Sequence, residues 1–213
     1  WQLFKDQQLS NLVDEAIKQN HDLEAASASL REARAMYLHT MVSLAPSVTS
    51  RASYVDQMRS SSAMNNRTFA PRELKLYSTG FDAAWELDLF GRSRRNVEAS
   101  TDEVEIQEAS LKDVMVSLIS EVARNYFELR GLQNQLAVLK QNAENQKKTL
   151  EITEVRVKNG RGTELDSARA AAQLDTTRAA IPSVETAISQ TLHRLSVLTG
   201  KYPNALTEKL ASV

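Results

Sequence analysis

The sequence predicts a mainly α-helical protein built around one long antiparallel helical hairpin, with a two-stranded β-hairpin preceding it. Three observations predict this fold class. Only 6 glycines and 4 prolines occur among the 213 residues, which favours long uninterrupted helices over a turn-rich β protein. Apolar residues with heptad spacing run through residues 92–158 and return in residues 163–199, which indicates a coiled coil. Residues 81–91 alternate apolar and acidic side chains, which indicates a β-strand.

Composition argues against several function classes. The net charge of -1 gives no electrostatic reason to expect nucleic-acid binding. The chain has no cysteine, so thiolate metal sites and cysteine nucleophiles are excluded. His21, His39 and His193 are scattered, and no HExxH, GxSxG or P-loop pattern occurs. We therefore expect no enzymatic activity, no cofactor and no bound metal. No apolar run approaches the roughly 18 residues of a transmembrane helix, so none is expected.

Two helices are expected at the start of the chain, within residues 1–45. Apolar residues from Leu9 to Ile17 recur with helical spacing, and Asp22 is a suitable N-cap for a second helix. Pro46 ends this helical region.

Residues 46–91 are predicted to form a β-hairpin. The first strand is expected at Val48–Met58 and the second at Leu74–Phe90, joined by a polar loop over residues 59–72. The second strand is longer than the roughly 9–11 residues that a tilted strand needs to cross a membrane.

The second predicted strand has one apolar and one acidic face. The apolar residues are Phe81, Trp85, Leu87 and Leu89, and the acidic residues are Asp82, Glu86 and Asp88. A membrane β-barrel would turn the first set to lipid and the second to a wet lumen. One edge strand packed on helices explains the pattern about equally well. Alternate residues on a strand lie about 7 Å apart, too far for tight chelation, so a solvated lumen-facing acidic surface is preferred over a metal site.

Residues 92–158 carry two rows that alternate by four and three residues, and eleven of their fourteen positions are apolar. One row is Met115, Val122, Leu129, Leu136, Ala143, Leu150 and Val157, and the other is Leu111, Leu118, Asn125, Leu132, Leu139, Gln146 and Thr153. This is the pattern of a coiled-coil seam. Asn125 and Gln146 could fix its register, face a channel or simply be tolerated there. A helix of this length would extend about 100 Å.

A turn at residues 159–162 separates this helix from a return helix over residues 163–199. The turn contains two glycines, and Thr163 can cap the next helix. Pro182 lies inside the return helix, where a kink or a break is expected. The helical hairpin is thus assigned to residues 92–200.

Four stretches resemble, in order, the TolC family of outer-membrane efflux proteins. The most specific is WELDLFGRSRR, residues 85–95, which is closest to the lipoprotein branch that resembles NodT. The others are residues 12–37, 156–168 and 181–203. Together they cover most of the chain and resemble the N-terminal repeat of a two-repeat protomer. The resemblance implies that residues 201–213 are an inter-repeat linker.

The resemblance implies two contact regions. In this family the turn between the long helices meets the tips of a periplasmic adaptor, which here corresponds to Asn159, Gly160, Arg161, Gly162, Thr163 and Glu164. Asn159 departs from the hydrophobic residue that is usual at its position. Arg92, Arg94 and Arg95 would lie at the periplasmic edge of the membrane, although a solvated first helical turn explains them equally well.

The resemblance also implies the function and the partners. Family members are homotrimeric outer-membrane ducts with a periplasmic tunnel, and they serve tripartite efflux of drugs or other small molecules, including multidrug resistance. Their partners are a periplasmic adaptor (membrane fusion protein), an inner-membrane pump and outer-membrane lipid. A soluble coiled-coil periplasmic adaptor or scaffold without a pore is the alternative, but it does not explain the alternation in residues 81–90.

The chain has neither the signal sequence nor the lipidated cysteine of this branch, and one repeat instead of two, so a half-length fragment is expected. Such a fragment could be soluble. Isolated two-stranded hairpins are marginal in water, and open edges are disfavoured in lipid. The strand segments of the fragment alone are therefore expected to lose the native barrel, becoming disordered, rebuilt as helix or buried in a non-native oligomer.

Overall fold

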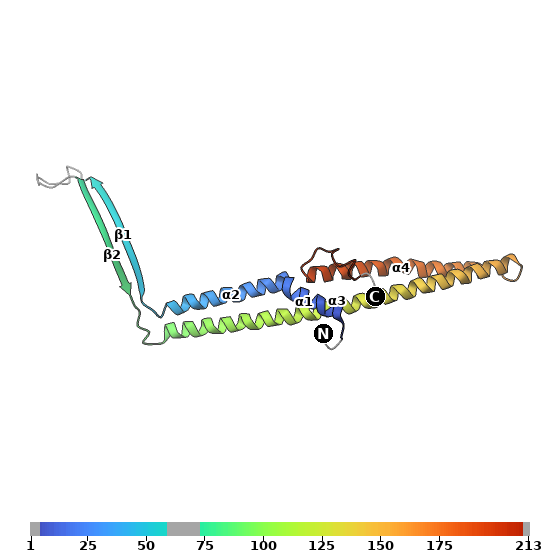
Figure 1. The fold of residues 1–213 in the computed structure, drawn as a ribbon, viewed down its shortest axis with the longest axis horizontal. Coiled ribbons are helices and arrows are strands. Elements are labelled where there is room, and N and C mark those ends of the chain that lie inside the picture. The colour runs from blue at the N-terminus through green and yellow to red at the C-terminus, as the bar shows by residue number, and fades with distance from the viewer. Residues whose placement is uncertain (1–4, 59–72, 211–213) are drawn as a thin grey trace, which may run out of the picture. The chain divides into compact units, whose positions relative to one another are not determined.

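The computed structural model describes residues 5–58 and 73–210. In this part of the chain four helices and a two-stranded antiparallel sheet follow one another as shown in Figure 1. The elements are α1 (Gln7–Gln19), α2 (His21–Val42), β1 (Ser47–Met58), β2 (Glu73–Ala84), α3 (Arg92–Lys158) and α4 (Glu164–Leu198). The predicted mainly α fold with a long helical hairpin is confirmed. The predicted loop over residues 59–72 lies outside the described residues.

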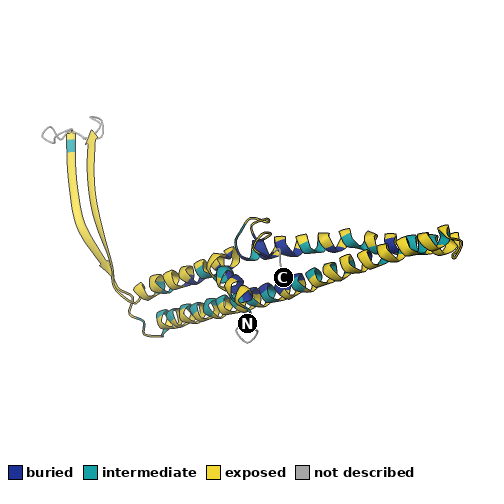
Figure 2. Cartoon of the chain, turned by 45° about the vertical axis from the view of Figure 1, so that its right-hand side comes forward, coloured by how far each residue is buried: buried dark blue, intermediate teal, exposed yellow. Residues whose placement is uncertain are grey.

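The long helical hairpin forms along the predicted seam. All fourteen seam positions of α3 are buried or half-buried, with Leu118, Val122 and Leu129 among the most buried. Helix α4 runs back beside the second half of α3 (Figures 1 and 2). One ion pair bridges the two helices between Lys140 and Glu185 at 3.0 Å. The heptad spacing therefore predicted the face that α3 buries, and the lack of proline between residues 92 and 158 predicted its extent.

Helix α4 continues unbroken through Pro182, so the possibility of a break there is wrong. Proline removes one backbone hydrogen bond, but the residues on either side pack into the seam. Val184 is buried, and Ile181 is half-buried. Packing of an apolar face contributes more to helix stability in proteins than any single backbone hydrogen bond.

Helix α1 closes a core against the hairpin helices. Figure 2 shows buried residues concentrated where α1, α3 and α4 meet. The core residues are Leu9, Leu12, Val13, Ala16, Leu23, Leu118, Val122, Tyr126, Leu129, Leu192, Leu195, Leu206 and Leu210. Leu206 and Leu210 belong to the segment after α4, and both are fully buried. This segment is therefore part of the core, in addition to any role as a connection.

Polar contacts fix the start of α1 on α3. Asp6 caps α1 by accepting hydrogen bonds from the backbone N–H groups of Gln8 and Leu9 at 2.8 and 3.1 Å. The Tyr126 hydroxyl donates to the other Asp6 carboxylate oxygen at 2.6 Å. The Arg130 guanidinium lies 5.1 Å from the Tyr126 ring centre. The Tyr126 hydrogen bond is the main reason that the pKa of Asp6 lies below its ordinary value.

Glu15 joins α1 to the segment after α4. Its carboxylate pairs with Lys201 at 2.6 Å and with Lys209 at 2.7 Å, and its side chain is 28% exposed. Partial burial raises the pKa of Glu15, but the hydrogen bonds from Lys201 and Lys209 outweigh this, so the net pKa is lowered. The ionised form is therefore favoured by folding.

We expect Glu15→Gln to lower the free energy of unfolding by about 1 kcal/mol at neutral pH. A carboxyl whose pKa is lowered by folding stabilises the fold above its unfolded pKa, and that contribution is lost as pH falls through the folded value. The difference between wild type and variant should therefore shrink as the pH is lowered below about 4.5, the ordinary pKa of a glutamate, in urea titrations followed by circular dichroism. Glu151→Gln, at an exposed position on α3, is the control and should show little difference at either pH. A gap that stays constant with pH would contradict the ionic origin.

The described chain packs as two compact units. One holds the described residues up to Ala28 and those from Ala109 onward, and the other is Ser29–Glu108. In the second unit the Ser100 hydroxyl donates to that of Thr40 at 3.1 Å, which joins α2 to α3. Several large apolar side chains in the second half of α2 are exposed, including Met36, Leu38, Met41 and Val42. Within the described residues, no helix is both long and apolar enough to cross a bilayer.

The β-hairpin pairs twelve residues of β1 with twelve of β2, from Ser47 opposite Ala84 to Met58 opposite Glu73. Extended, paired backbone is present in both segments, so the expectation that they become disordered or are rebuilt as helix is wrong. The backbone groups on the facing edges of the two strands pair with each other, which favours extended backbone over helix in both segments. The predicted second strand is also too long, because β2 ends at Ala84 and not at Phe90.

Candidate functional site

The turn between α3 and α4 is an exposed, closely hydrogen-bonded tip formed by residues 159–164. Gly160 has a φ of 70°, a left-handed conformation that favours glycine. The Arg161 N–H donates to the Arg156 carbonyl at 2.8 Å, and the Gly160 N–H donates to the Val157 carbonyl at 2.9 Å. This pair of bonds is a Schellman motif, which satisfies carbonyl groups at the end of α3. A Cβ on Gly160 would meet no atom within 4 Å.

The second half of the tip is fixed by a capping box at the start of α4. The Thr163 hydroxyl accepts a hydrogen bond from the Asp166 N–H, and the Asp166 carboxylate accepts one from the Thr163 N–H at 3.0 Å. The Thr163 hydroxyl also donates to this carboxylate at 2.7 Å. These bonds hold the pKa of Asp166 below its ordinary value. The capping role predicted for Thr163 is confirmed.

The tip presents a preformed surface with basic side chains on the α3 side. Asn159, Gly160, Arg161, Gly162, Thr163 and Glu164 are all exposed. Arg156 and Lys158 lie in the last turn of α3, where cations are favoured by the helix dipole. Both helix ends are satisfied by the chain itself, so a partner would meet a surface that needs little ordering.

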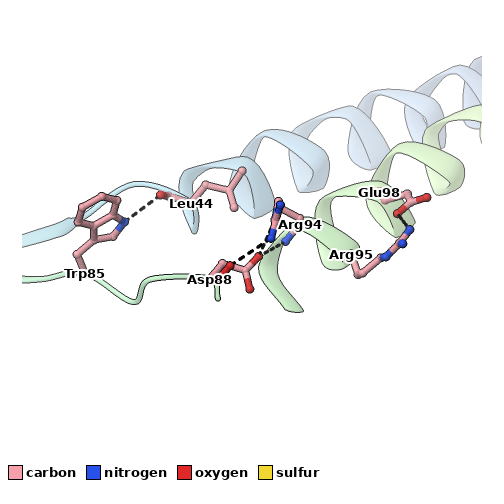
Figure 3. A network of polar contacts seen from close by, with 6 residues as sticks. All are labelled: Leu44, Trp85, Asp88, Arg94, Arg95 and Glu98. Atoms are coloured by element: carbon pink, nitrogen blue, oxygen red, sulfur yellow. Dashed lines mark hydrogen bonds and ion pairs between the residues drawn. The ribbon is translucent and has the colours of Figure 1, made fainter. Parts of the chain in front are cut away.

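The second candidate region is the junction between β2 and α3, residues 85–95, which Figure 3 shows in part. The Trp85 indole N–H donates to the Leu44 carbonyl at 3.2 Å, which ties the end of β2 to the end of α2. The Asp88 carboxylate accepts hydrogen bonds from the backbone N–H of Arg94 at 2.9 Å and from its guanidinium at 3.4 Å. The backbone hydrogen bond is the main reason that the pKa of Asp88 lies below its ordinary value.

Glu86 and Asp88 do not continue the alternation of a strand, which corrects the sequence prediction. Glu86 pairs with Arg92 through both carboxylate oxygens, at 2.9 and 3.0 Å. Asp88 accepts the backbone N–H of Arg94, one of the first N–H groups of α3, which have no partner inside the helix. These two contacts with the first turn of α3 are the physical reason that the strand does not continue. Asp82 remains in β2, on the opposite face from Phe81.

The apolar residues of the junction are exposed. Trp85 and Leu87 are each 61% exposed, Leu89 is 78% exposed and Phe90 is 99% exposed. Trp85, Leu87 and Leu89 lie beyond the end of β2, so of the predicted membrane-facing set only Phe81 belongs to a strand. Sequence reasoning missed the pairing of Arg92 and Arg94 with Glu86 and Asp88. The sequence does carry a signal for this pairing, because each acidic residue is followed six positions later, across Gly91, by an arginine.

The described residues contain no arrangement that suggests catalysis. Among residues 5–58 and 73–210, no three His, Cys, Asp or Glu side chains gather closely enough to hold a metal ion. His21 lies 3.3 Å from Glu24 at the surface, and the ring of His193 lies 3.1 Å from Asn204. Both contacts are local and exposed.

Comparison with known proteins gives a consistent result. A family model described as outer membrane efflux protein matches residues 12–201. The cation efflux system protein CusC of Escherichia coli K12 is 28% identical over 199 residues, which are 93% of this chain and 42% of CusC. The probable outer membrane lipoprotein SilC of Salmonella typhimurium is 27% identical over 208 residues, which are 97% of this chain and 43% of SilC.

The same similarity extends to solved structures. The structure of the outer-membrane channel OprN has a TM-score of 0.85 and 38% sequence identity, and it covers 99% of this chain and 46% of that one. A structure of CusC, from work on its folding and transmembrane channel formation, has a TM-score of 0.82 and 26% identity. The chain thus spans less than half the length of each of these relatives.

Proposed function

The chain belongs to the outer membrane efflux protein family, and from this premise we propose that it forms the first repeat of a two-repeat outer-membrane channel subunit in a tripartite efflux system. Three such subunits would enclose a continuous passive duct. The β-hairpin would contribute to a barrel in the outer membrane, and α3 and α4 would form part of the wall of a periplasmic tunnel.

One observation carries this proposal: a single helix of 67 residues connects the β-hairpin to the exposed tip. At 1.5 Å per residue such a helix extends about 100 Å, far more than a compact globular domain of this size requires. A helix of this length suits a tunnel that crosses a wide aqueous compartment. Along the chain the β-hairpin precedes this helix, and the tip follows it.

The mechanism would be architectural and would involve no covalent chemistry. An inner-membrane pump would supply energy and cargo, and a periplasmic adaptor would join the pump to the tip at residues 159–164. Outer-membrane lipid would surround the β-hairpin. The exposed apolar residues of α2 and of the hairpin support this reading, because each such surface needs lipid or a neighbouring subunit to cover it.

Reconstitution of the full-length protein that contains this chain tests the proposal. We expect it to be extracted from membranes only with detergent, to run as a trimer and to give stepwise ionic conductance in planar bilayers. A soluble periplasmic scaffold, the alternative function, would be released without detergent and would give no conductance. Either of those two results would count against a channel.

A further inference from the structure

The two faces of the β-hairpin differ in charge along most of its length. The register places Val48, Ser50, Ala52 and Tyr54 on one face with their partners Ala83, Phe81, Thr79 and Tyr77. None of these eight side chains is charged. The opposite face carries Arg51 and Asp82 together with small polar residues over the same stretch. The uncharged face is therefore the one suited to lipid, and the charged face is suited to water.

Aromatic residues lie at one end of the uncharged face and just beyond its other end, where Trp85 directly follows β2. At one end the rings of Tyr54 and Tyr77 lie 4.9 Å apart between centres. At the other end Trp85 is fixed by its hydrogen bond to the Leu44 carbonyl. Tyrosine and tryptophan favour the boundary between hydrocarbon and water, because one side of each ring system is apolar and the other is polar.

The spacing of these aromatic residues matches the thickness of a barrel's apolar band. At about 3.4 Å per residue the chain between Tyr77 and Trp85 extends roughly 27 Å. With the tilt of about 40° usual for barrel strands, this corresponds to about 21 Å along the membrane normal, close to the band of about 25 Å expected for such barrels.

Beyond the tyrosine pair the two faces exchange character. Asp56 and Lys75 are the next pair on the face that carries Tyr54, and Met58 and Glu73 follow. On the opposite face Val55 pairs with Leu76, and Gln57 pairs with Leu74. A strand that continued through lipid would keep its apolar side outward, so the exchange indicates that the surroundings change at the tyrosine pair.

We infer that lipid covers one face of the hairpin only from Trp85 to the Tyr54–Tyr77 pair, and that the hairpin beyond this pair projects out of the bilayer with its charged face in water. This inference rests on the proposed function and adds the boundaries of the lipid-contacting surface. Lipid is the occupant that fits this face, because the band is uncharged, has an aromatic residue at each boundary and has about the thickness of a barrel's apolar band.

A matched pair of charge insertions on the same face tests the inference in the full-length protein. Ala52→Arg places a cation inside the proposed band, and Asp56→Arg places one just beyond it. We expect Ala52→Arg to reduce the trimer recovered from outer membranes by about tenfold or more, while Asp56→Arg changes it by less than about twofold. Equal losses for the two variants would overturn the boundary at the tyrosine pair.

Spin labels at single cysteines supply a second measurement that does not depend on assembly yield. Labels at Ala52 and Thr79 should collide more with oxygen than with a water-soluble nickel complex, and labels at Ser53 and Asp56 should show the reverse. Oxygen preference at Asp56 would overturn the inference even if the wild-type protein conducts ions. Absence of conductance by the wild-type protein would instead overturn the proposed function.

Discussion

Gly200→Ala should lower the free energy of unfolding of this chain by about 3 kcal/mol or more, the largest stability effect we expect from a single methyl group here. Gly200 ends α4 with a φ of 67°. The Lys201 N–H donates to the Ser196 carbonyl at 2.8 Å, and the Gly200 N–H donates to that of Val197 at 2.9 Å. The left-handed conformation alone would cost alanine roughly 1–2 kcal/mol.

The larger part of the effect comes from the neighbouring backbone. A Cβ on Gly200 would lie 2.2 Å from the carbonyl oxygen of Gln19 and 2.9 Å from its carbonyl carbon. Backbone atoms cannot rotate away as a side chain can. The end of α1 is also held in place, because the Asn20 side chain donates to the Leu198 carbonyl at 3.0 Å. The methyl group would therefore separate α1 from α4, where the core is most buried.

Urea unfolding followed by circular dichroism measures this effect, and Gly131→Ala is the matched control. Gly131 lies inside α3 with no neighbouring atom within 4 Å of an added Cβ. The same substitution there should raise stability by about 1 kcal/mol, because alanine favours helix over glycine. An unchanged midpoint for Gly200→Ala, or a loss for Gly131→Ala, would contradict the packing described here.

The helical hairpin could be predicted from the sequence because its signal repeats. Seven-residue spacing from Leu111 to Val157 covers fourteen positions, of which eleven are apolar, and one buried face of a helix explains this spacing. The turn was equally predictable, since Gly160 and Thr163 have local roles that depend only on their neighbours in the chain. Such features need no knowledge of distant contacts.

The end of β2 and the closure of the core could not be predicted in the same way. The alternation of apolar and acidic residues continues to Leu89, but the start of α3 uses Glu86 and Asp88 as partners for its arginines and its N–H groups. The alternating pattern alone does not reveal whether an acidic side chain stabilises the fold more in a continuing strand or at the start of the next helix. The Tyr126 hydrogen bond to Asp6 joins residues 120 positions apart, and no spacing rule indicates it.

Bulky substitution of Gly160 should abolish efflux by the full-length protein while leaving its amount and its trimeric state unchanged. The space around Gly160 is open, so a large side chain would project outward without displacing the fold. The cost to the turn would be limited to the left-handed conformation, roughly 1–2 kcal/mol. A partner that packs on residues 159–164 would be held away by the new side chain.

Two substitutions separate the effect on the turn from the effect on the contact. Gly160→Asn keeps the conformation, because asparagine tolerates left-handed backbone, and adds a small side chain. Gly160→Trp adds a large one. If the tip packs on the adaptor, efflux should fall partly in the first variant and by about tenfold or more in the second, since a displaced buried contact costs several kcal/mol of binding free energy.

Gly131→Asn, at an exposed position of α3 away from the tip, is the control and should leave efflux near the wild-type value. Efflux is measured as the accumulation of a fluorescent cargo in cells, and outer-membrane protein is quantified in parallel. Crosslinking of the adaptor to the tip should fall in the same variants as efflux, partly in Gly160→Asn and most in Gly160→Trp. Normal efflux by Gly160→Trp at normal abundance would refute the contact. It would also show that the preformed hydrogen bonds of Thr163 and Asp166 serve only to close the hairpin.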